Sequence, residues 1–216
     1  HTLAQARPGM RGTVQMSAGG EVELQPQAKL KYQVHELHAD IGAKGVQLDG
    51  QPLGDVHVTA SSQGPALRAH LDAMLAGSAV KGDGEWRLEG DLPGTAAISF
   101  GKVDLASLAP WLGKAGSEAA RFAGSSEGSL RIDGPVLNWH GLKAELRIPQ
   151  FQLGPAPVAD VAAAALMVKN AAPIVVRFAN SIVTVESAHL VGRGTDLNIT
   201  GRVLLALESS SARMSR

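Results

Sequence analysis

The sequence predicts an all-β, elongated protein built from repeated strands that bury one face. A short phrase recurs in which two apolar residues are separated by one polar residue and bounded by glycine: GEWRLEG at Gly84 to Gly90, GSLRIDG at Gly128 to Gly134, TDLNITG at Thr195 to Gly201 and a looser GVQLDG at Gly45 to Gly50. Alternation with a period of two is typical of a strand with one buried and one wet face, and the glycines indicate turns. Composition agrees, because 25 glycines, 11 prolines and only 4% aromatic residues favour many short strands joined by turns.

Other segments alternate in the same way and are predicted as strands. The clearest runs from Leu142 to Ile148, where the apolar residues share one face and the charged residues share the other. The same pattern predicts strands at Leu30 to Val34, Val56 to Ala60, Ile174 to Phe178 and Val183 to Val185.

Two segments fit both a helix and a strand or loop. The apolar residues of Leu67 to Leu75 match a helical stripe and a strand equally well, but Gly64 and Gly77 bracket the segment at strand length, so we favour a strand. In the segment Ser107 to Ala123, the serine is placed to cap a helix. We therefore expect one or two short helices between Leu108 and Phe122.

Turn residues support one continuous domain. The dipeptides Asp49-Gly50, Asp83-Gly84 and Asp133-Gly134 are predicted turns, and the stretch from Pro155 to Pro157 separates two groups of strands without resembling a flexible linker. We therefore predict a single elongated repetitive β domain over residues 1–207 and a polar, disordered tail over 208–216. Because His1 stands where a start methionine is expected, we expect the chain to be a piece of a longer one.

Charge and composition exclude several classes of function. The 20 basic and 20 acidic residues are spread singly, so no basic stripe is available to neutralise the phosphates of a nucleic acid. The chain has no cysteine, which excludes a disulfide framework and a thiolate metal site. The longest apolar stretch, Val161 to Val168, is far shorter than the roughly 20 residues that a membrane-spanning helix needs.

The sequence also gives little sign of a catalytic or metal-binding site. His35 and His38 have a metal-like spacing, but in a strand they point to opposite faces. The chain has one Gly-x-Ser-x-Gly sequence, GSSEG at Gly124 to Gly128, at which we predict no nucleophile elbow, and GAKG at Gly42 to Gly45 lacks the second half of a phosphate loop. A parallel β-helix lyase is the enzyme class most like this composition, but it needs clustered acids or a calcium site. We therefore predict no catalytic residues, no metal, no cofactor and no enzymatic activity.

The second half of the chain resembles a known family. The matching phrases are LAPWL at Leu108 to Leu112, GSLRIDGPVLNWHGLKAELRI from Gly128 to Ile148, and the block from Ala172 to Val203. They are similar to the periplasmic body of the TamB family (translocation and assembly module subunit), which belongs to the AsmA-like, bridge-like lipid-transfer superfamily. The sequence departs from the family pattern where Trp139 and His140 follow Pro135, because a proline is expected nearer the tryptophan.

The resemblance implies a long β-sheet curled lengthwise into an open half-pipe, or β-taco, with an apolar concave groove. It also implies a periplasmic protein of a diderm bacterium that is anchored in the inner membrane and touches membranes through parts of the full-length chain outside this segment. The implied function is a non-enzymatic conduit that carries phospholipid across the periplasm and supports outer-membrane biogenesis. The implied partners are phospholipid acyl chains and an outer-membrane barrel of the Omp85 class.

Patterning alone leaves the use of the apolar faces open. They could line a lipid groove, or they could pack against each other as a dry sandwich or solenoid core, in which case the chain is a structural β-scaffold or adhesin-like module that binds an assembly partner by strand addition. If they line a groove, the expected lining residues are Trp86, Leu88, Leu130, Ile132, Leu142, Leu146, Ile148, Ile174, Val176, Phe178, Val183, Val185, Leu197 and Ile199.

Tryptophans and basic residues also allow two readings. Trp86, Trp111 and Trp139 could meet lipid headgroups at a rim, but ordinary packing accounts for them as well. Basic residues on the opposite strand faces, such as Lys143 and Arg147, could attract anionic headgroups, but a solvated outer face explains them more simply.

Overall fold

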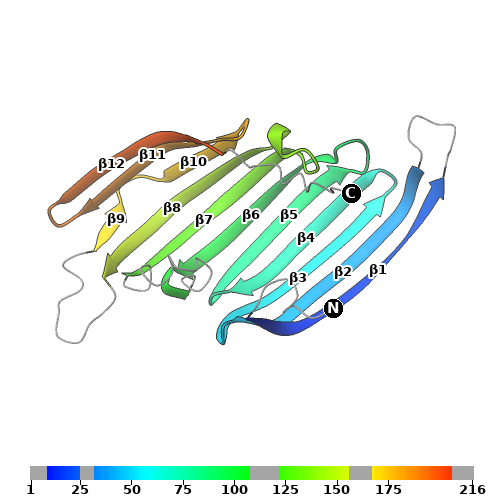
Figure 1. Cartoon of the computed structure of the whole chain (residues 1–216), viewed down its shortest axis with the longest axis horizontal. Helices are drawn as coiled ribbons and strands as arrows, with labels where there is room; N and C mark the ends of the chain where they lie inside the picture. The colour runs from blue at the N-terminus through cyan, green and yellow to red at the C-terminus, as the bar shows by residue number, and fades with distance from the viewer. Residues whose placement is uncertain (1–8, 25–31, 108–121, 156–166, 206–216) are drawn as a thin grey trace, which may run out of the picture.

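The computed structural model shows one large antiparallel β-sheet (Figure 1). The structure describes residues 9–24, 32–107, 122–155 and 167–205. Within these residues twelve strands form a single sheet. Along its main path each strand pairs with the next one in the sequence, except that β8 pairs with β10. β9 lies off this path and pairs with β8 and β11. The predicted all-β class is confirmed, and the described residues form one sheet rather than the two sheets of a sandwich.

The strand bounds show how regular the sheet is. The strands are β1 (Met10–Leu24), β2 (Tyr32–Leu48), β3 (Gln51–Gln63), β4 (Ala66–Leu75), β5 (Ser78–Arg87), β6 (Pro93–Asp104), β7 (Phe122–Pro135), β8 (Lys143–Pro155), β9 (Val168–Asn170), β10 (Ile174–Ala179), β11 (Ile182–Gly192) and β12 (Thr195–Leu204). A one-turn 3-10 helix, η2 (Trp139–Gly141), lies between β7 and β8. No helix formed by the described residues is long and apolar enough to cross a membrane.

The strands predicted from alternation are confirmed where the structure describes them. Val56 to Ala60 lies in β3, Ile174 to Phe178 in β10 and Val183 to Val185 in β11. The ambiguous segment Leu67 to Leu75 is a strand, because it lies within β4. All but the first residue of Leu142 to Ile148 lies in β8.

Several predictions lie wholly or partly outside the described residues. The helices expected between Leu108 and Phe122 do so except for Phe122, which opens β7. The others are Trp111, the first two residues of Leu30 to Val34, the stretch from Pro155 to Pro157 after its first residue, and the polar tail over 208–216.

Two-residue turns join several neighbouring strands. Asp49 and Gly50 link β2 to β3 with φ values of +51° and +78°, as a hairpin turn with two left-handed residues requires, so that predicted turn is confirmed. Ala76 and Gly77 link β4 to β5 in the same conformation, with φ values of +51° and +75°.

The predicted turns at Asp83-Gly84 and Asp133-Gly134 are wrong. Asp83 and Gly84 lie inside β5, and Gly134 lies in β7, where it pairs with Gly94. Most other glycines of the repeated phrase also lie inside strands: Gly45 in β2, Gly128 in β7 and Gly201 in β12.

Candidate functional site

The cross-strand register aligns apolar residues into rows that run across the whole sheet. Direct partners in neighbouring strands point to the same face, so an unbroken chain of partners defines a row. The central row contains one residue from each strand of the main path: Met16, Ile41, Val58, Leu71, Gly82, Ile98, Leu130, Leu146, Val176, Val185 and Gly201. We call the face that carries this row the apolar face.

A parallel row lies beside the central one, two residues away along each strand. Its members are small on the first six strands and larger on most strands from β7 onward: Ala18, Ala39, Ala60, Ala69, Gly84, Ala96, Ile132, Ala144, Phe178, Val183 and Val203. The side chains of this second row are therefore shorter on β1 to β6 than on most of the later strands.

The structure brings most of the predicted lining residues together on the apolar face. Twelve of them lie in strands with their side chains on this face: Trp86, Leu130, Ile132, Leu146, Ile148, Ile174, Val176, Phe178, Val183, Val185, Leu197 and Ile199. Leu88 and Leu142 lie just outside the strands, after β5 and before β8.

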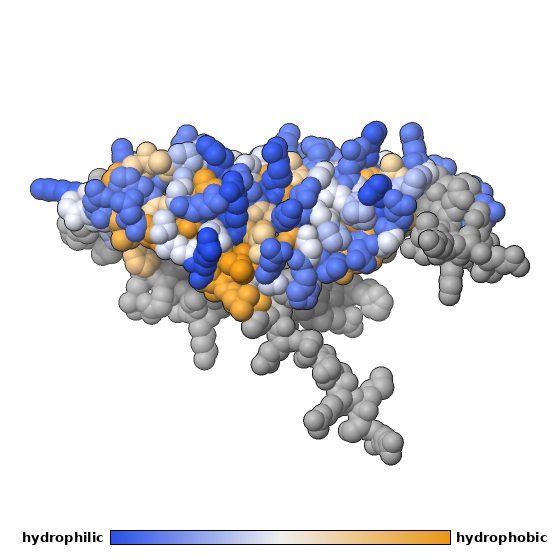
Figure 2. Space-filling model, turned by 90° about the horizontal axis from the view of Figure 1, so that it is seen from above, coloured by the Kyte–Doolittle hydropathy of each residue, from blue (hydrophilic) through white to orange (hydrophobic). Residues whose placement is uncertain are grey.

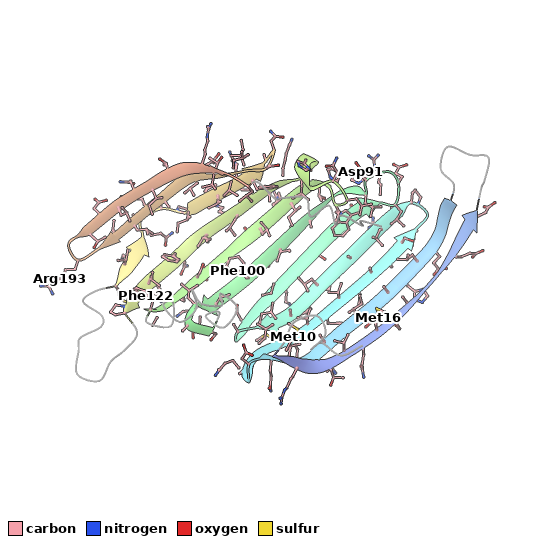
Figure 3. All side chains as sticks on the ribbon, viewed as in Figure 1. Met10, Met16, Asp91, Phe100, Phe122 and Arg193 are labelled. Atoms are coloured by element: carbon pink, nitrogen blue, oxygen red, sulfur yellow. The ribbon has the colours of Figure 1, made fainter. Side chains whose placement is uncertain are left out.

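The glycines inside the strands make room for aromatic rings on the apolar face. A Cβ atom built at Gly84 or Gly94 would collide with the indole ring of Trp86. At Gly128 it would lie 2.8 Å from the Cζ atom of Phe100. Figure 3 shows Phe100 near the middle of the sheet. At Gly84 the glycine of the repeated phrase therefore makes room for a ring and does not form a turn, whereas a Cβ atom at Gly134 would lie 2.7 Å from the backbone carbonyl oxygen of Gly141.

Few side chains of the apolar face are fully covered. Among the described residues, the buried apolar side chains are Val46, Ala73, Val103 and Ala188, whereas the large residues of the central row are half-buried or exposed. The edge-on view in Figure 2 shows the thin profile of the sheet, with hydrophilic side chains standing along one side. This pattern differs from a sandwich core, in which a second sheet covers the inner face.

The opposite face carries charged and hydroxyl side chains that pair across strands. His70 Nδ1 lies 2.8 Å from Asp83 Oδ1, and Arg68 Nε donates to Glu85 Oε1 at 2.6 Å. His189 Nε2 lies 2.8 Å from Asp196 Oδ1. These partners are exposed or half-buried, so each pair contributes little to stability.

A further exposed network, formed by Arg177 with Glu145 and Glu186, shifts the pKa of Arg177. The hydrogen bond from Arg177 Nε to Glu145 Oε2, at 2.8 Å, together with the charge of Glu186, raises the pKa of Arg177 above its ordinary value. A raised pKa favours the charged form in the folded state, so this contribution is present at every pH below the ordinary pKa of arginine and is lost only in stronger alkali.

The charged face also contains a shallow depression of about 640 Å³. Its lining includes a line of direct cross-strand partners, Thr59, His70, Asp83, Ala97 and Arg131. The depression is open to solvent and its acids are paired with basic groups, so it offers no concentrated charge to a ligand.

The geometry gives no support to a metal site in the described part of the chain. Within it, no three His, Asp or Glu side chains gather closely enough to hold a metal ion. His38 lies over Gly19 on the charged face, and the side chain of His35 is outside the described residues.

Sequence reasoning missed the central-row residues of β1 to β4 and of β6. Met16, Ile41, Val58, Leu71 and Ile98 continue the row that Leu130 and Leu146 begin in the second half. The alternation in β3 and β4 was a sufficient signal for Val58 and Leu71, whereas the polar and glycine-rich strand β1 gave little signal for Met16.

Comparison of the chain with protein-family models, with curated proteins and with solved structures finds no match.

Proposed function

We propose that this chain is a hydrophobic conduit segment of a TamB-like protein. Its apolar face would form the concave wall of a lengthwise-curled half-pipe and hold phospholipid acyl chains as they cross the periplasm between the inner and outer membranes. The observation that carries the proposal is the central row, because it is an unbroken line of cross-strand partners from β1 to β12 in which all residues except Gly82 and Gly201 carry apolar side chains, with no second sheet of described residues over it.

The energetics of lipid transfer explain why such a face suits the task. Each methylene group moved from hydrocarbon into water costs about 0.8 kcal/mol, so an acyl chain of roughly 15 methylenes costs on the order of 12 kcal/mol to expose. A conduit must replace nearly all of that contact at every position. Aliphatic side chains provide it without the directional hydrogen bonds that would hold lipid at one place.

The proposal is tested by the lipid content of matched variants in β8. Leu146 lies between Leu130 and Val176 in the central row, and Arg147 is exposed on the opposite face. Leu146→Asp places a carboxylate on the lipid path, where an apolar surrounding makes its charge costly. Native mass spectrometry is expected to find phospholipid bound to the wild-type chain and to Arg147→Asp, and much less bound to Leu146→Asp.

Circular dichroism separates the possible reasons for a loss. An open face lets water reach the new carboxylate, so Leu146→Asp is expected to fold. A wild-type chain without lipid, or a folded Leu146→Asp variant with normal lipid content, contradicts the conduit. An unfolded Leu146→Asp variant favours the alternative, a structural scaffold with a dry apolar core.

A further inference from the structure

We propose that the charged face carries a binding groove for a linear acidic oligosaccharide. The groove crosses the sheet from β6 to β11 and joins two depressions that share Gln152 and Lys169. The proposed lipid path lies on the other side of the sheet. This binding site therefore goes beyond the proposed lipid function and does not depend on it.

Cross-strand partners place the groove on the charged face. Ser125, Gln152, Lys169 and Val191 are successive direct partners from β7 to β11, so their side chains share one face. Ser125 stands at an odd position of β7, like Arg131, which belongs to the charged face. The two depressions have volumes of about 310 Å³ and about 460 Å³.

Two β-bulges shape the floor of the groove. Between Phe100 and Val103, β6 contains one residue more than the facing part of β7, and Lys102 lies in this bulge. Between Arg147 and Gln150, β8 also contains one residue more than the facing part of β7. A bulge bends its strand locally and redirects side chains, and bulges are frequent beside functional sites. Here Lys102 and Gln150 both line the first depression.

The groove carries a positive net charge. Lys102, Lys169 and Arg193 line it, all three are exposed, and none forms an ion pair within the part of the chain that the structure describes. Arg193 lies at the tip of the hairpin of β11 and β12 (Figure 3). Among the described lining residues Glu127 is the only acid, so the net charge of +2 favours an anionic ligand.

Neutral hydrogen-bonding side chains lie between the cations. Ser125, Gln150 and Gln152 line the groove, and Gln152 Nε2 donates to Ser125 Oγ at 2.9 Å. That bond orients the amide of Gln152 and leaves its oxygen to accept from a ligand hydroxyl. From β6 to β11 the groove crosses four strand spacings, roughly 19 Å. A matching ligand is therefore extended, with hydroxyl groups between separated negative charges, as in an acidic oligosaccharide.

The proposal is tested by calorimetric titration of the whole chain with an oligogalacturonate long enough to span the groove. The wild-type chain is expected to bind it and not to bind an uncharged maltooligosaccharide of equal length. Lys102→Gln and Lys169→Gln each remove one charge-assisted contact, so each is expected to bind about tenfold more weakly. Lys81→Gln is the matched control, because Lys81 is exposed on the charged face of β5 outside the groove, and it is expected to bind like the wild-type chain.

Two further variants separate an oligosaccharide site from a general attraction of anions. Glu127→Gln removes the acid that repels the ligand, so it is expected to bind up to about fivefold more tightly. Gln152→Ala changes no charge but removes the amide, so it is expected to bind about fivefold more weakly.

Weaker binding by both lysine variants and by Gln152→Ala, with tighter binding by Glu127→Gln, supports the groove. A wild-type chain that does not bind oligogalacturonate overturns the proposal, as does a Lys81→Gln variant that loses as much affinity as the groove variants. Polyglutamate or a single-stranded oligonucleotide that binds as tightly as oligogalacturonate overturns the assignment to an oligosaccharide. Circular dichroism of each variant confirms that its sheet is intact.

Discussion

Asn170→Ala is expected to destabilise the sheet at the place where β8 changes partners. β8 pairs with β10 as far as Ile148 and with β9 from Gln152 onward, which leaves a gap in the ladder between them. The side chain of Asn170, at the end of β9, fills that gap. Its Oδ1 accepts a hydrogen bond from the backbone N–H of Phe151 at 2.7 Å.

The amide nitrogen of Asn170 satisfies two further backbone groups. Nδ2 donates to the carbonyl of Pro149 at 2.9 Å and to the carbonyl of Ala172 at 2.8 Å. Each of the three hydrogen bonds contributes roughly 1 kcal/mol net, and a partly buried N–H left without an acceptor costs about as much again. Asn170→Ala should therefore lower the free energy of unfolding by about 2–4 kcal/mol.

Urea denaturation followed by circular dichroism measures this loss. Asn170→Asp keeps the acceptor for Phe151 but removes the donors, so its midpoint should lie between those of the wild type and the alanine variant. Asn198→Ala, on the exposed strand β12, is the matched control and should change stability by less than about 0.5 kcal/mol. The reasoning is refuted if Asn170→Ala also stays within that margin.

Two further substitutions test the packing of the apolar face, with opposite expected signs. Gly128→Val would place a Cβ atom 2.5 Å from the carbonyl oxygen of Arg147, so thermal melts should show a loss of about 1–3 kcal/mol, whereas Gly201→Val, with no atom within 4 Å, should be tolerated. Ser62 is buried on the same face and its Oγ has no hydrogen-bond partner among the described residues, so Ser62→Ala should keep or raise stability, by up to about 1 kcal/mol; a clear loss of stability would reveal an unrecognised partner of that hydroxyl.

The fold class follows from the sequence because alternation is a local property. In a segment such as Leu142 to Ile148, each residue's face is fixed by its neighbours two positions away, so the strand and its apolar side can be read directly. The same reasoning resolved Leu67 to Leu75 as a strand, because the flanking glycines limit its length.

Register is not a local property, and the sequence does not reveal it. Nothing near Leu130 in the sequence indicates that Ile98 and Leu146 are its direct partners, because register depends on turn lengths and bulges elsewhere. The misplaced turn at Asp83-Gly84 has a related cause. A glycine in a turn and a glycine beneath an aromatic ring have the same sequence signal, and only the position of Trp86 distinguishes them.

The direction of the rows bears on how a conduit of this kind would work. Strand order runs along the long axis of the molecule from β1 to β12, so the central row follows that axis and crosses each strand in turn (Figure 1). A lipid moving along the row passes a new strand about every 4.8 Å, the spacing of neighbouring strands. An acyl chain of about 15 methylenes would contact several strands at once. When it moves on by one strand, for example from Leu71 in β4 to Gly82 in β5, only a small share of its total contact changes. Exchange of one contact for a similar one at each step keeps the barrier to movement low, and a charge at Leu146 would interrupt that exchange at one strand while leaving the rest of the row intact.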